Sequence, residues 1–298
     1  MKQFKELTRR NIILFFKDKG MFFTSLITPA ILLVLYATFL GNVYKDSFLM
    51  GLPKGFTLAE DLINGLVGGQ LMSSILAVSC VTVAFSSNML MVQDKANDTI
   101  KDLAVSPVKK SVLALSYYFA TLVSTLIICY AAMAICCAYV ASIGWYLSVI
   151  DVLLLAFDIF LLVMFGTALS SVINIFLSSQ GQIAAVGTIM SAGYGFICGA
   201  YMPISSFSPG LQKVISFLPG TYGTSLVRNH SMNGALTEMS DAGLPAEAVD
   251  GLRDAIDCNL YFFDSKVSIP VMYVVLGATT VLLIAIYVLL NVVRSKKK

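Results

Sequence analysis

Residues 62–93 read LINGLVGGQLMSSILAVSCVTVAFSSNMLMVQ, a run of 32 residues without one charged side chain. About 20 residues of helix cross the hydrocarbon core of a bilayer, so this run is long enough to span it. Two further uncharged runs, 21–41 with 21 residues and 267–293 with 27, meet the same requirement. Three separate parts of the chain therefore predict transmembrane helices.

Two longer uncharged runs lie between them, 111–150 with 40 residues and 159–212 with 54, and each is too long for one helix. Each contains a turn-like interruption, SIGW at 142–145 and SSQGQ at 178–182. Lipid offers no hydrogen-bond partners to the backbone, so spanning segments are helices rather than open strands. We predict an all-α integral membrane protein with six transmembrane helices, near residues 21–41, 62–92, 111–141, 149–177, 182–201 and 268–291.

The basic residues indicate the orientation of these helices. Fourteen of the 20 Lys and Arg residues lie in the segments 1–20, 94–110 and 294–298, which an even number of spans places on one side. Positive side chains accumulate on the cytoplasmic side, so we predict that both termini are cytoplasmic. The remaining six share longer segments with most of the acidic residues. The net charge of +3 is explained by the basic residues at the inner face, where they contact anionic lipid. It does not indicate nucleic-acid binding.

The whole chain, 1–298, is predicted to form a single transmembrane domain. Residues 1–20 have the pattern of a basic amphipathic helix at the inner membrane interface, and the first span has the features of a retained helix. Residues 94–108 predict a short charged helix on the cytoplasmic side, stopped by Ser106-Pro107. Residues 202–267 predict an acidic outer loop with helices beginning at Ser208-Pro209 and at Pro245.

Small and polar residues mark two helix faces as candidates for a translocation path. In the fifth span they recur every four residues, and in the second span they form a polar side that must contact protein or water. For the fifth span, close packing against another helix and a small-residue wall lining a path are both open. The residues are Gly187, Ser191, Gly195 and Gly199 in the fifth span and Gln70, Ser73 and Ser74 in the second.

Asp158 is the one acidic residue predicted to lie inside the hydrocarbon region. A carboxylate there is costly and often functional. No basic residue in a predicted span offers it a partner. It either reaches interfacial water or Ser and Tyr hydroxyls in a structural role, or it belongs to a substrate or proton path.

The sequence excludes several kinds of chemistry for this chain. It contains no Gly-x4-Gly-Lys-Ser/Thr motif, so we expect no ATP site. Its one histidine, His230, has no neighbouring metal ligands and is predicted to be exposed in the outer loop. We therefore expect no catalytic residue, no metal site and no cofactor bound by this chain.

The motifs before the third span resemble those of permeases of the type-two exporter family of ATP-binding-cassette (ABC) transporters. In that family a basic amphipathic helix leads to a first span with a proline and a final glycine. The connection after the second span usually carries an acid, a Gly-Thr pair and a Ser-Pro-hydrophobic ending. Asp98 stands where the glycine is usual, and Gln93-Asp94 where a glutamate is usual. The matching residues are Arg9-Arg10, Pro29, Gly41, Asp94, Thr99, Leu103 and Ser106-Pro107-Val108.

The segment after the fifth span carries the most specific part of this resemblance, which covers essentially the whole chain. The family has a glycine, a proline and then a Pro-x-x-aromatic motif followed by an arginine. In the family this outer region dips back into the outer leaflet as a short re-entrant helical hairpin above the pathway. Gly220 replaces a usual bulky apolar residue. The corresponding residues are Gly199, Pro203, Pro219, Tyr222 and Arg228.

The resemblance implies a permease that pairs with a second copy or a homologous permease and with separate ABC ATPase subunits, which carry the ATP and Mg. It implies export of a hydrophobic or amphipathic molecule (drug, antimicrobial peptide or lipid) across a bacterial plasma membrane, as in multidrug efflux and antibiotic resistance. An ion-coupled secondary transporter or channel, with Asp158 as the available ion site, is the alternative; a membrane-embedded enzyme would need clustered His, Asp or Glu. The residues implied in ATPase coupling are Asp94, Asp98, Thr99, Lys101, Asp102, Ser106 and Pro107.

Overall fold

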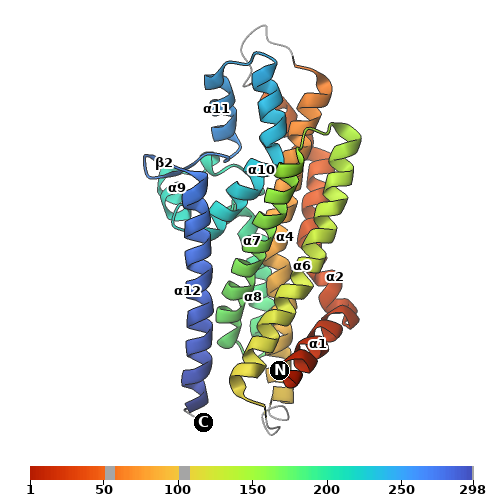
Figure 1. Cartoon of the computed structure of the whole chain (residues 1–298), viewed down its shortest axis with the longest axis vertical. Helices are drawn as coiled ribbons and strands as arrows, with labels where there is room; N and C mark the ends of the chain where they lie inside the picture. Colours follow the sequence, from red (N-terminus) through yellow and green to blue (C-terminus); the bar gives the residue numbers. More distant parts are fainter. Residues whose placement is uncertain (51–57, 101–107, 297–298) are drawn as a thin grey trace.

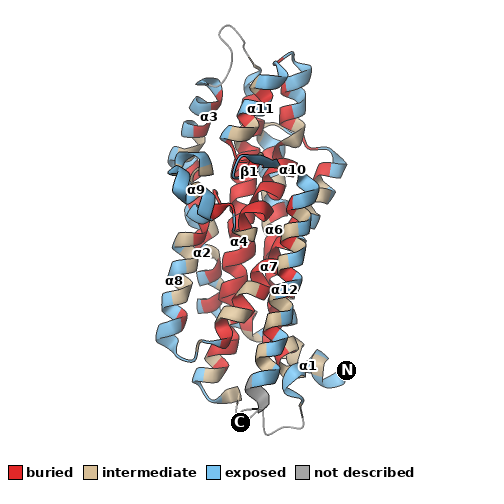
Figure 2. Ribbon diagram, turned by 90° about the vertical axis from the view of Figure 1, so that its left-hand side faces the viewer, coloured by how far each residue is buried: buried red, intermediate tan, exposed pale blue. Residues whose placement is uncertain are grey.

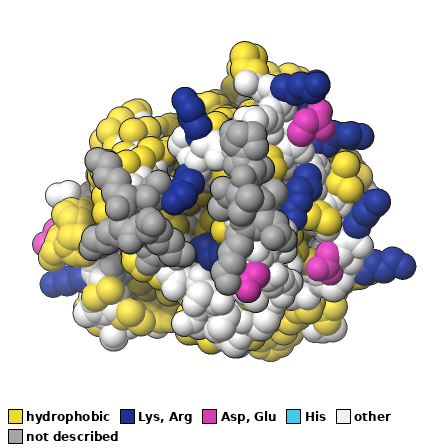
Figure 3. All heavy atoms as spheres, turned by 90° about the horizontal axis from the view of Figure 1, so that it is seen from below, with side chains coloured by type: hydrophobic (Ala, Val, Ile, Leu, Met, Phe, Trp, Pro, Cys, Tyr) yellow, Lys and Arg dark blue, Asp and Glu magenta, His cyan; other side chains and the backbone are white. Residues whose placement is uncertain are grey.

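The computed structural model describes residues 1–50, 58–100 and 108–296. They form an elongated, nearly all-α bundle with both chain termini at one end (Figure 1). We call this the basic end, because the Lys and Arg side chains of residues 2–19 and 109–110 gather there; the opposite end, which carries residues 246–255, is the distal end. Seen from the basic end, several Lys and Arg side chains are spread over the surface, with a few acidic ones among them (Figure 3).

The first span is longer than the sequence predicts. Helix α1 (Lys2–Lys17) ends at Asp18, whose carboxylate accepts a hydrogen bond from the Met21 N–H and so caps α2 (Lys19–Leu35). Pro29 lies inside α2 without ending it. The helix continues through a π-helical turn, η1 (Tyr36–Leu40), into α3 (Gly41–Met50), so residues 19–50 form one long helical segment.

Helix α4 (Glu60–Ala96) is the axis around which the bundle is built. It packs against α2, α6 (Lys110–Ile143), α7 (Val149–Ile175), α8 (Gln180–Ile197) and α10. Its side chains are buried along almost the whole helix, whereas the outer faces of α8 and α12 (Ile269–Lys296) are exposed (Figure 2). The Asn88 amide of α4 donates to the hydroxyl groups of Ser170 (3.0 Å) and Ser171 (2.9 Å) of α7. Hydrogen bonds between polar side chains therefore connect helices whose overall composition is apolar.

Both predicted interruptions are confirmed. Helix α6 ends at Ile143, and α7 begins after Ser148 with a capping box, in which the Asp151 N–H donates to Ser148 Oγ (3.1 Å) and the Ser148 N–H donates to the Asp151 carboxylate (3.0 Å). Helix α7 ends at Ile175, and Ser179 caps α8. The boundaries of α7 and α8 lie a few residues from those predicted.

The segment predicted as an outer loop is mostly helical. The two predicted helices are present as α9 (Pro209–Ile215) and α11 (Ala246–Ala255). Three features of this segment were not predicted from the sequence. They are α10 (Pro219–Asp241), which packs on α4, α7 and α12, the 3-10 turn η2 (Ile204–Ser206), and a short antiparallel hairpin of β1 (Leu260–Phe262) and β2 (Ser265–Val267). Helix α10 escaped notice because it is covered by protein and carries polar residues where a lipid-facing helix would be apolar.

Within the described residues, five helical segments are long and apolar enough to cross a membrane: Lys19–Met50, Glu60–Ala96, Lys110–Ile143, Val149–Ile175 and Ile269–Val293. Helix α8, the predicted fifth span, has 18 residues and is not among them. Its glycines and its two glutamines, Gln180 and Gln182, lower its hydropathy. The fifth span, and with it the total of six, therefore stays a prediction.

Candidate functional site

At the basic end, the last turn of α4 is tied to three other helices. Arg10 of α1 donates to the Asp94 carboxylate (2.8 Å), and the Tyr117 hydroxyl of α6 donates to the same oxygen (2.5 Å). The Lys95 ammonium donates to the carbonyl oxygen of Asn174 (2.8 Å) at the C-terminal end of α7, where the helix dipole favours a cation. The hydrogen bond to Asp94 raises the pKa of Arg10, against the opposing effect of burial. We call these four residues, Arg10, Asp94, Lys95 and Tyr117, the basic-end junction.

The predicted coupling residues lie partly at this junction. Asp94 is buried in the final turn of α4 and is not on a separate helix. Asp98 follows in the left-handed conformation (φ 60°), and Thr99 is helical. Lys101, Asp102, Ser106 and Pro107 lie outside the described residues, so the coupling role of the segment stays a prediction.

Asp158 has two partners that the sequence analysis did not assign. Its Oδ2 atom lies 2.5 Å from Nδ1 of His230 on α10, and the Tyr273 hydroxyl of α12 donates to its Oδ1 atom at 2.5 Å. The prediction that His230 is exposed is wrong, because α10 carries it into the bundle, where it is 8% exposed. The histidine partner comes from outside the predicted spans, where no basic residue was available. The Tyr273 contact is of the kind proposed for a structural role of Asp158, and the substrate or proton path stays the other prediction.

Helix α10 is held to its neighbours by polar side chains along its length. The Asn233 amide donates to Asp151 of α7 (3.0 Å), one turn beyond the His230 contact. The Asn229 amide and the Ser225 hydroxyl both donate to the carbonyl oxygen of Cys258 (2.6 and 3.0 Å). The recurrence of Ser225, Asn229 and Asn233 every four residues is a helical signal that could have revealed α10 from the sequence.

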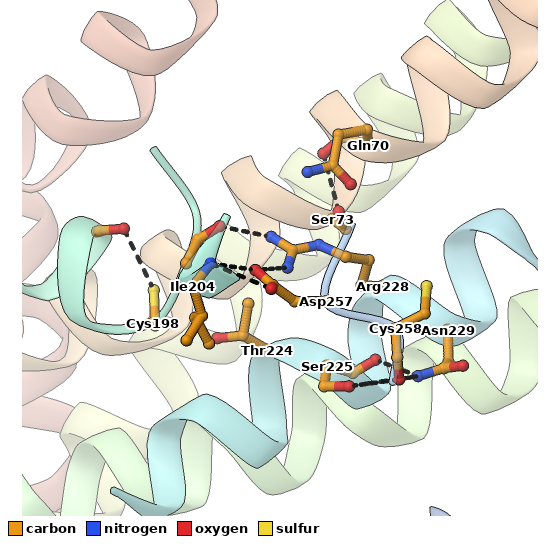
Figure 4. Close-up of polar contacts among 12 residues, drawn as sticks. Gln70, Ser73, Cys198, Ile204, Thr224, Ser225, Arg228, Asn229, Asp257 and Cys258 are labelled. Atoms are coloured by element: carbon orange, nitrogen blue, oxygen red, sulfur yellow. Dashed lines mark hydrogen bonds and ion pairs between the residues drawn. The ribbon is translucent and has the colours of Figure 1, made fainter. Parts of the chain in front are cut away.

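Arg228 of α10 is fully buried inside the bundle toward the distal end, the part of the molecule that we call the distal half. Figure 4 shows the polar contacts around it. It donates to the Gly199 carbonyl oxygen (2.8 Å) and forms an ion pair with Asp257 (3.2 Å). The Asp257 carboxylate also accepts from the Ile204 N–H (2.9 Å). Burial raises the pKa of Asp257, and the charge of Arg228 opposes that rise. The structure brings together Gly199 and Arg228, both of which were predicted from the sequence. Asp257, the ion-pair partner of Arg228, was not predicted.

The profile of the ABC-2 type transporter family matches residues 2–230 of this chain. The chain belongs to the ABC-2 type transporter family. No curated protein matches it significantly. The protein is therefore an ABC-type permease, a transport subunit with several membrane-spanning helices. The match covers α1 through the middle of α10, whereas Asp257 and Tyr273 lie beyond it.

The predicted path residues of α4 lie in the interior of the permease. Gln70, Ser73 and Ser74 are completely buried. The Ser73 hydroxyl donates to the backbone of its own helix (2.8 Å), whereas the Gln70 amide and the Ser74 hydroxyl make no hydrogen bond within the part of the chain that the structure describes. Their role in transport stays a prediction.

The small residues of the fifth span do not form one continuous contact with a neighbouring helix. Gly187 faces the Met89 side chain of α4, and Gly195 faces the ring of Tyr201. Gly199 lies past the end of α8 in the left-handed conformation (φ 74°), which ends the helix, and Ser191 is half-buried.

The close backbone approaches of the permease lie elsewhere. A Cβ atom at Gly69 would lie 2.7 Å from the carbonyl oxygen of Ser231 on α10, and one at Gly166 would lie 2.8 Å from that of Cys80 on α4.

The other predicted residues of the segment after the fifth span, Pro203, Pro219 and Tyr222, make contacts close to them in the sequence. Pro219 begins α10, the Tyr222 hydroxyl donates to the Ser216 carbonyl oxygen (2.5 Å), and Pro203 precedes η2. Among the described residues, no group of three or more His, Cys, Asp or Glu side chains could hold a metal.

Proposed function

We propose that this permease is the membrane subunit of an ABC exporter, powered by ATP that a separate cassette subunit hydrolyses. The observation that carries the proposal is α4. This helix runs without a break from the polar groups around Arg228 to the basic-end junction, so a force applied at residues 94–108 would reach the distal half through one stiff element. The family membership supports the ATPase partner in general.

The proposed topology has six spans, with α8 as the fifth and the basic end in the cytoplasm. Exposed Lys2, Lys5, Arg9 and Lys110 at this end support the orientation, because cytoplasmic segments are enriched in Lys and Arg. Residues 202–218 would form the outer re-entrant hairpin. In bacteria the corresponding membrane is the plasma membrane.

We further propose that two permeases associate through α8. Its exposed face carries small residues, which allow close approach of a second helix in lipid. The same architecture suits a hydrophobic or amphipathic substrate, since the described walls of the bundle are mainly apolar. The exposed small residues are Ala184, Ala185, Thr188 and Ala192.

One observation favours a second candidate function. The buried contacts of Asp158 with His230 and Tyr273 resemble the ionisable pairs that carry protons in ion-coupled transporters. A secondary transporter would lose activity when a protonophore removes the proton gradient, and it would need no ATP.

The test is to purify the tagged permease from its host, identify co-purifying proteins, and reconstitute the complex in inside-out vesicles. We expect a cassette ATPase to co-purify and ATP to drive accumulation of an amphipathic dye in the vesicles. Dye transport that is lost with a protonophore, and is independent of ATP, would overturn the exporter assignment.

A charge reversal tests the coupling segment directly. We expect the double substitution Lys101→Asp with Asp102→Lys to reduce ATP hydrolysis and dye transport by about tenfold, because the coupling surface would meet the ATPase with reversed charges. The matched control is Lys5→Glu with Glu6→Lys, an adjacent pair on the exposed face of α1. Equal activity of the two double variants would remove 94–108 from the coupling role.

A further inference from the structure

Five polar side chains in the distal half bury hydrogen-bonding atoms that have no hydrogen-bond partner among the residues that the structure describes. We call Tyr36, Tyr44, Gln70, Ser74 and Arg228 the distal polar cluster; the unpaired atoms are three hydroxyl groups, the Gln70 amide and Nε of Arg228. They come from η1, α3, α4 and α10.

These side chains lie together. The rings of Tyr36 and Tyr44 stack with centroids 5.5 Å apart. The Tyr36 hydroxyl lies near the hydroxyl groups of Ser74 and Tyr44 without completing a hydrogen bond of good geometry, and it is also close to the charge of Arg228. Gln70 and Ser74 are one turn apart and share a face of α4.

Unpaired polar atoms in a protein interior are costly. Each one costs about 1–3 kcal/mol when it is buried without a hydrogen bond, and such groups are rare in folded proteins. Several of them at one place therefore indicate a site that something else fills. Water or the polar end of a bound molecule could provide the partners.

The chemistry of the cluster selects what it can bind. The three hydroxyl groups can donate or accept hydrogen bonds, the Gln70 NH2 group and the Arg228 Nε–H only donate, and the Gln70 carbonyl oxygen is the one pure acceptor in the cluster. The charge of Arg228 is balanced by Asp257. A donor-rich, nearly neutral site favours a carbonyl, amide or carboxylate group, and it disfavours an ammonium group, which only donates.

An apolar cavity adjoins the cluster. It has a volume of about 620 Å³ and lies between α3, the segment 201–206 and α11. Its wall includes Val43, Phe48, Met202, Leu252 and Ile256, and also Tyr44, which thus belongs to both the cavity and the cluster. Cavities of about 300–1,000 Å³ with apolar walls and a few polar groups are typical of small-molecule sites.

We propose that this cavity and the distal polar cluster together form a binding site for a small amphipathic molecule whose polar end accepts hydrogen bonds. The apolar body occupies the cavity, and the polar end reaches the cluster past Tyr44. Its role as the site of the exported substrate rests on the proposed function; the binding itself does not.

The test uses the full-length permease in lipid nanodiscs, without ATP or any ATPase subunit. The probe is 11-(dansylamino)undecanoic acid, whose fluorescence rises on entering an apolar site, with empty nanodiscs as the blank. We expect saturable binding that dodecanoic acid and dodecanamide displace and dodecylamine does not. Absence of saturable binding, or equal displacement by dodecylamine, would overturn the proposal.

The substitution Tyr44→Phe removes one donor and keeps the ring that stacks on Tyr36. We expect it to weaken probe binding by about fivefold to tenfold, as the loss of one hydrogen bond does. The matched control is Tyr139→Phe on α6, where the tyrosine is 48% exposed. Ser74→Ala is the second variant, should Tyr44→Phe fail to fold.

The results separate the possible readings. A Tyr44→Phe protein that melts at a higher temperature and binds the probe as tightly as the parent would show that the cluster only holds water, and the proposal would fall. Failure to bind in a permease that still exports with its ATPase would refute this site and leave the proposed function intact.

Discussion

Asp98 shows how one backbone angle explains a departure from the family pattern. It adopts a left-handed conformation, φ 60°, directly after α4. This region is open to glycine and tolerated by aspartate and asparagine, whereas other side chains clash with the backbone. The family that the chain resembles usually has a glycine at this position. The left-handed turn explains that glycine, and aspartate can adopt the same conformation.

We expect Asp98→Gly to be more stable than Asp98→Ala by about 1 kcal/mol, because both remove the carboxylate and only alanine is strained at this angle. Thermal unfolding of the two purified variants measures the difference. Equal melting temperatures would show that the turn adopts another conformation.

Asp158 and His230 form a buried contact that joins α7 to α10. Removing one member of such a hydrogen-bonded pair costs about 1–3 kcal/mol, because a buried polar group is left without its partner. We expect His230→Gln and Asp158→Asn each to lower thermal stability strongly, and the double variant to recover part of the loss. Asp241→Asn, at the exposed end of α10, is the control. Losses that simply add in the double variant would contradict a direct interaction.

At the scale of elements, helix packing depends on single glycines whose positions the sequence does not reveal. A Cβ atom at Gly166 of α7 would meet the Cys80 carbonyl oxygen at 2.8 Å and the Val81 Cα atom at 3.0 Å. Both are backbone atoms and cannot rotate away. Gly193 of α8, by contrast, faces open space.

We therefore expect Gly166→Ala to lower stability by about 1–3 kcal/mol through overpacking, and Gly193→Ala to leave it unchanged. Size-exclusion chromatography of heated samples would measure both. A Gly166→Ala protein as stable as the Gly193→Ala control would show that α4 and α7 can separate at no cost.

The apolar helices could be predicted, and the polar helix α10 could not. The uncharged runs predicted α2, α4, α6, α7 and α12, and this signal does not depend on which surface they face, since α4 is covered by protein. Helix α10 leaves no such record, since His230 and Asn233 are satisfied by Asp158 and Asp151 on α7. Part of the candidate site was predicted through the pair Gly199 and Arg228, but Asp257 and Tyr273 join it from distant parts of the chain.

At the scale of the whole molecule, export requires that buried residues of α4 become accessible in some state. Ser73 is 0% exposed in this conformation. In a background without native cysteines, we expect Ser73→Cys to react with a polar thiol reagent in one nucleotide state of the complex and not in another. Ser191→Cys on α8 should follow the same pattern.

The matched control is Ser79→Cys, which is similarly buried and lies about 120° around α4 from Ser73. Labelling of Ser73→Cys that does not depend on nucleotide would favour a channel. Labelling of Ser79→Cys to the same extent would indicate unfolding of the bundle rather than an opened path.

The central position of α4 also constrains how the chain is made. A ribosome completes residues 60–96 before any part of α6, α7 or α10, which later cover Gln70 and Asn88. The newly inserted helix must keep these amides out of the lipid until its partners have been synthesised, so the insertion machinery or α2 has to shelter it meanwhile. In a nascent chain that stops after α4, the amide groups of this helix would remain without partners in the bilayer. Such a chain would be a substrate for quality-control proteases.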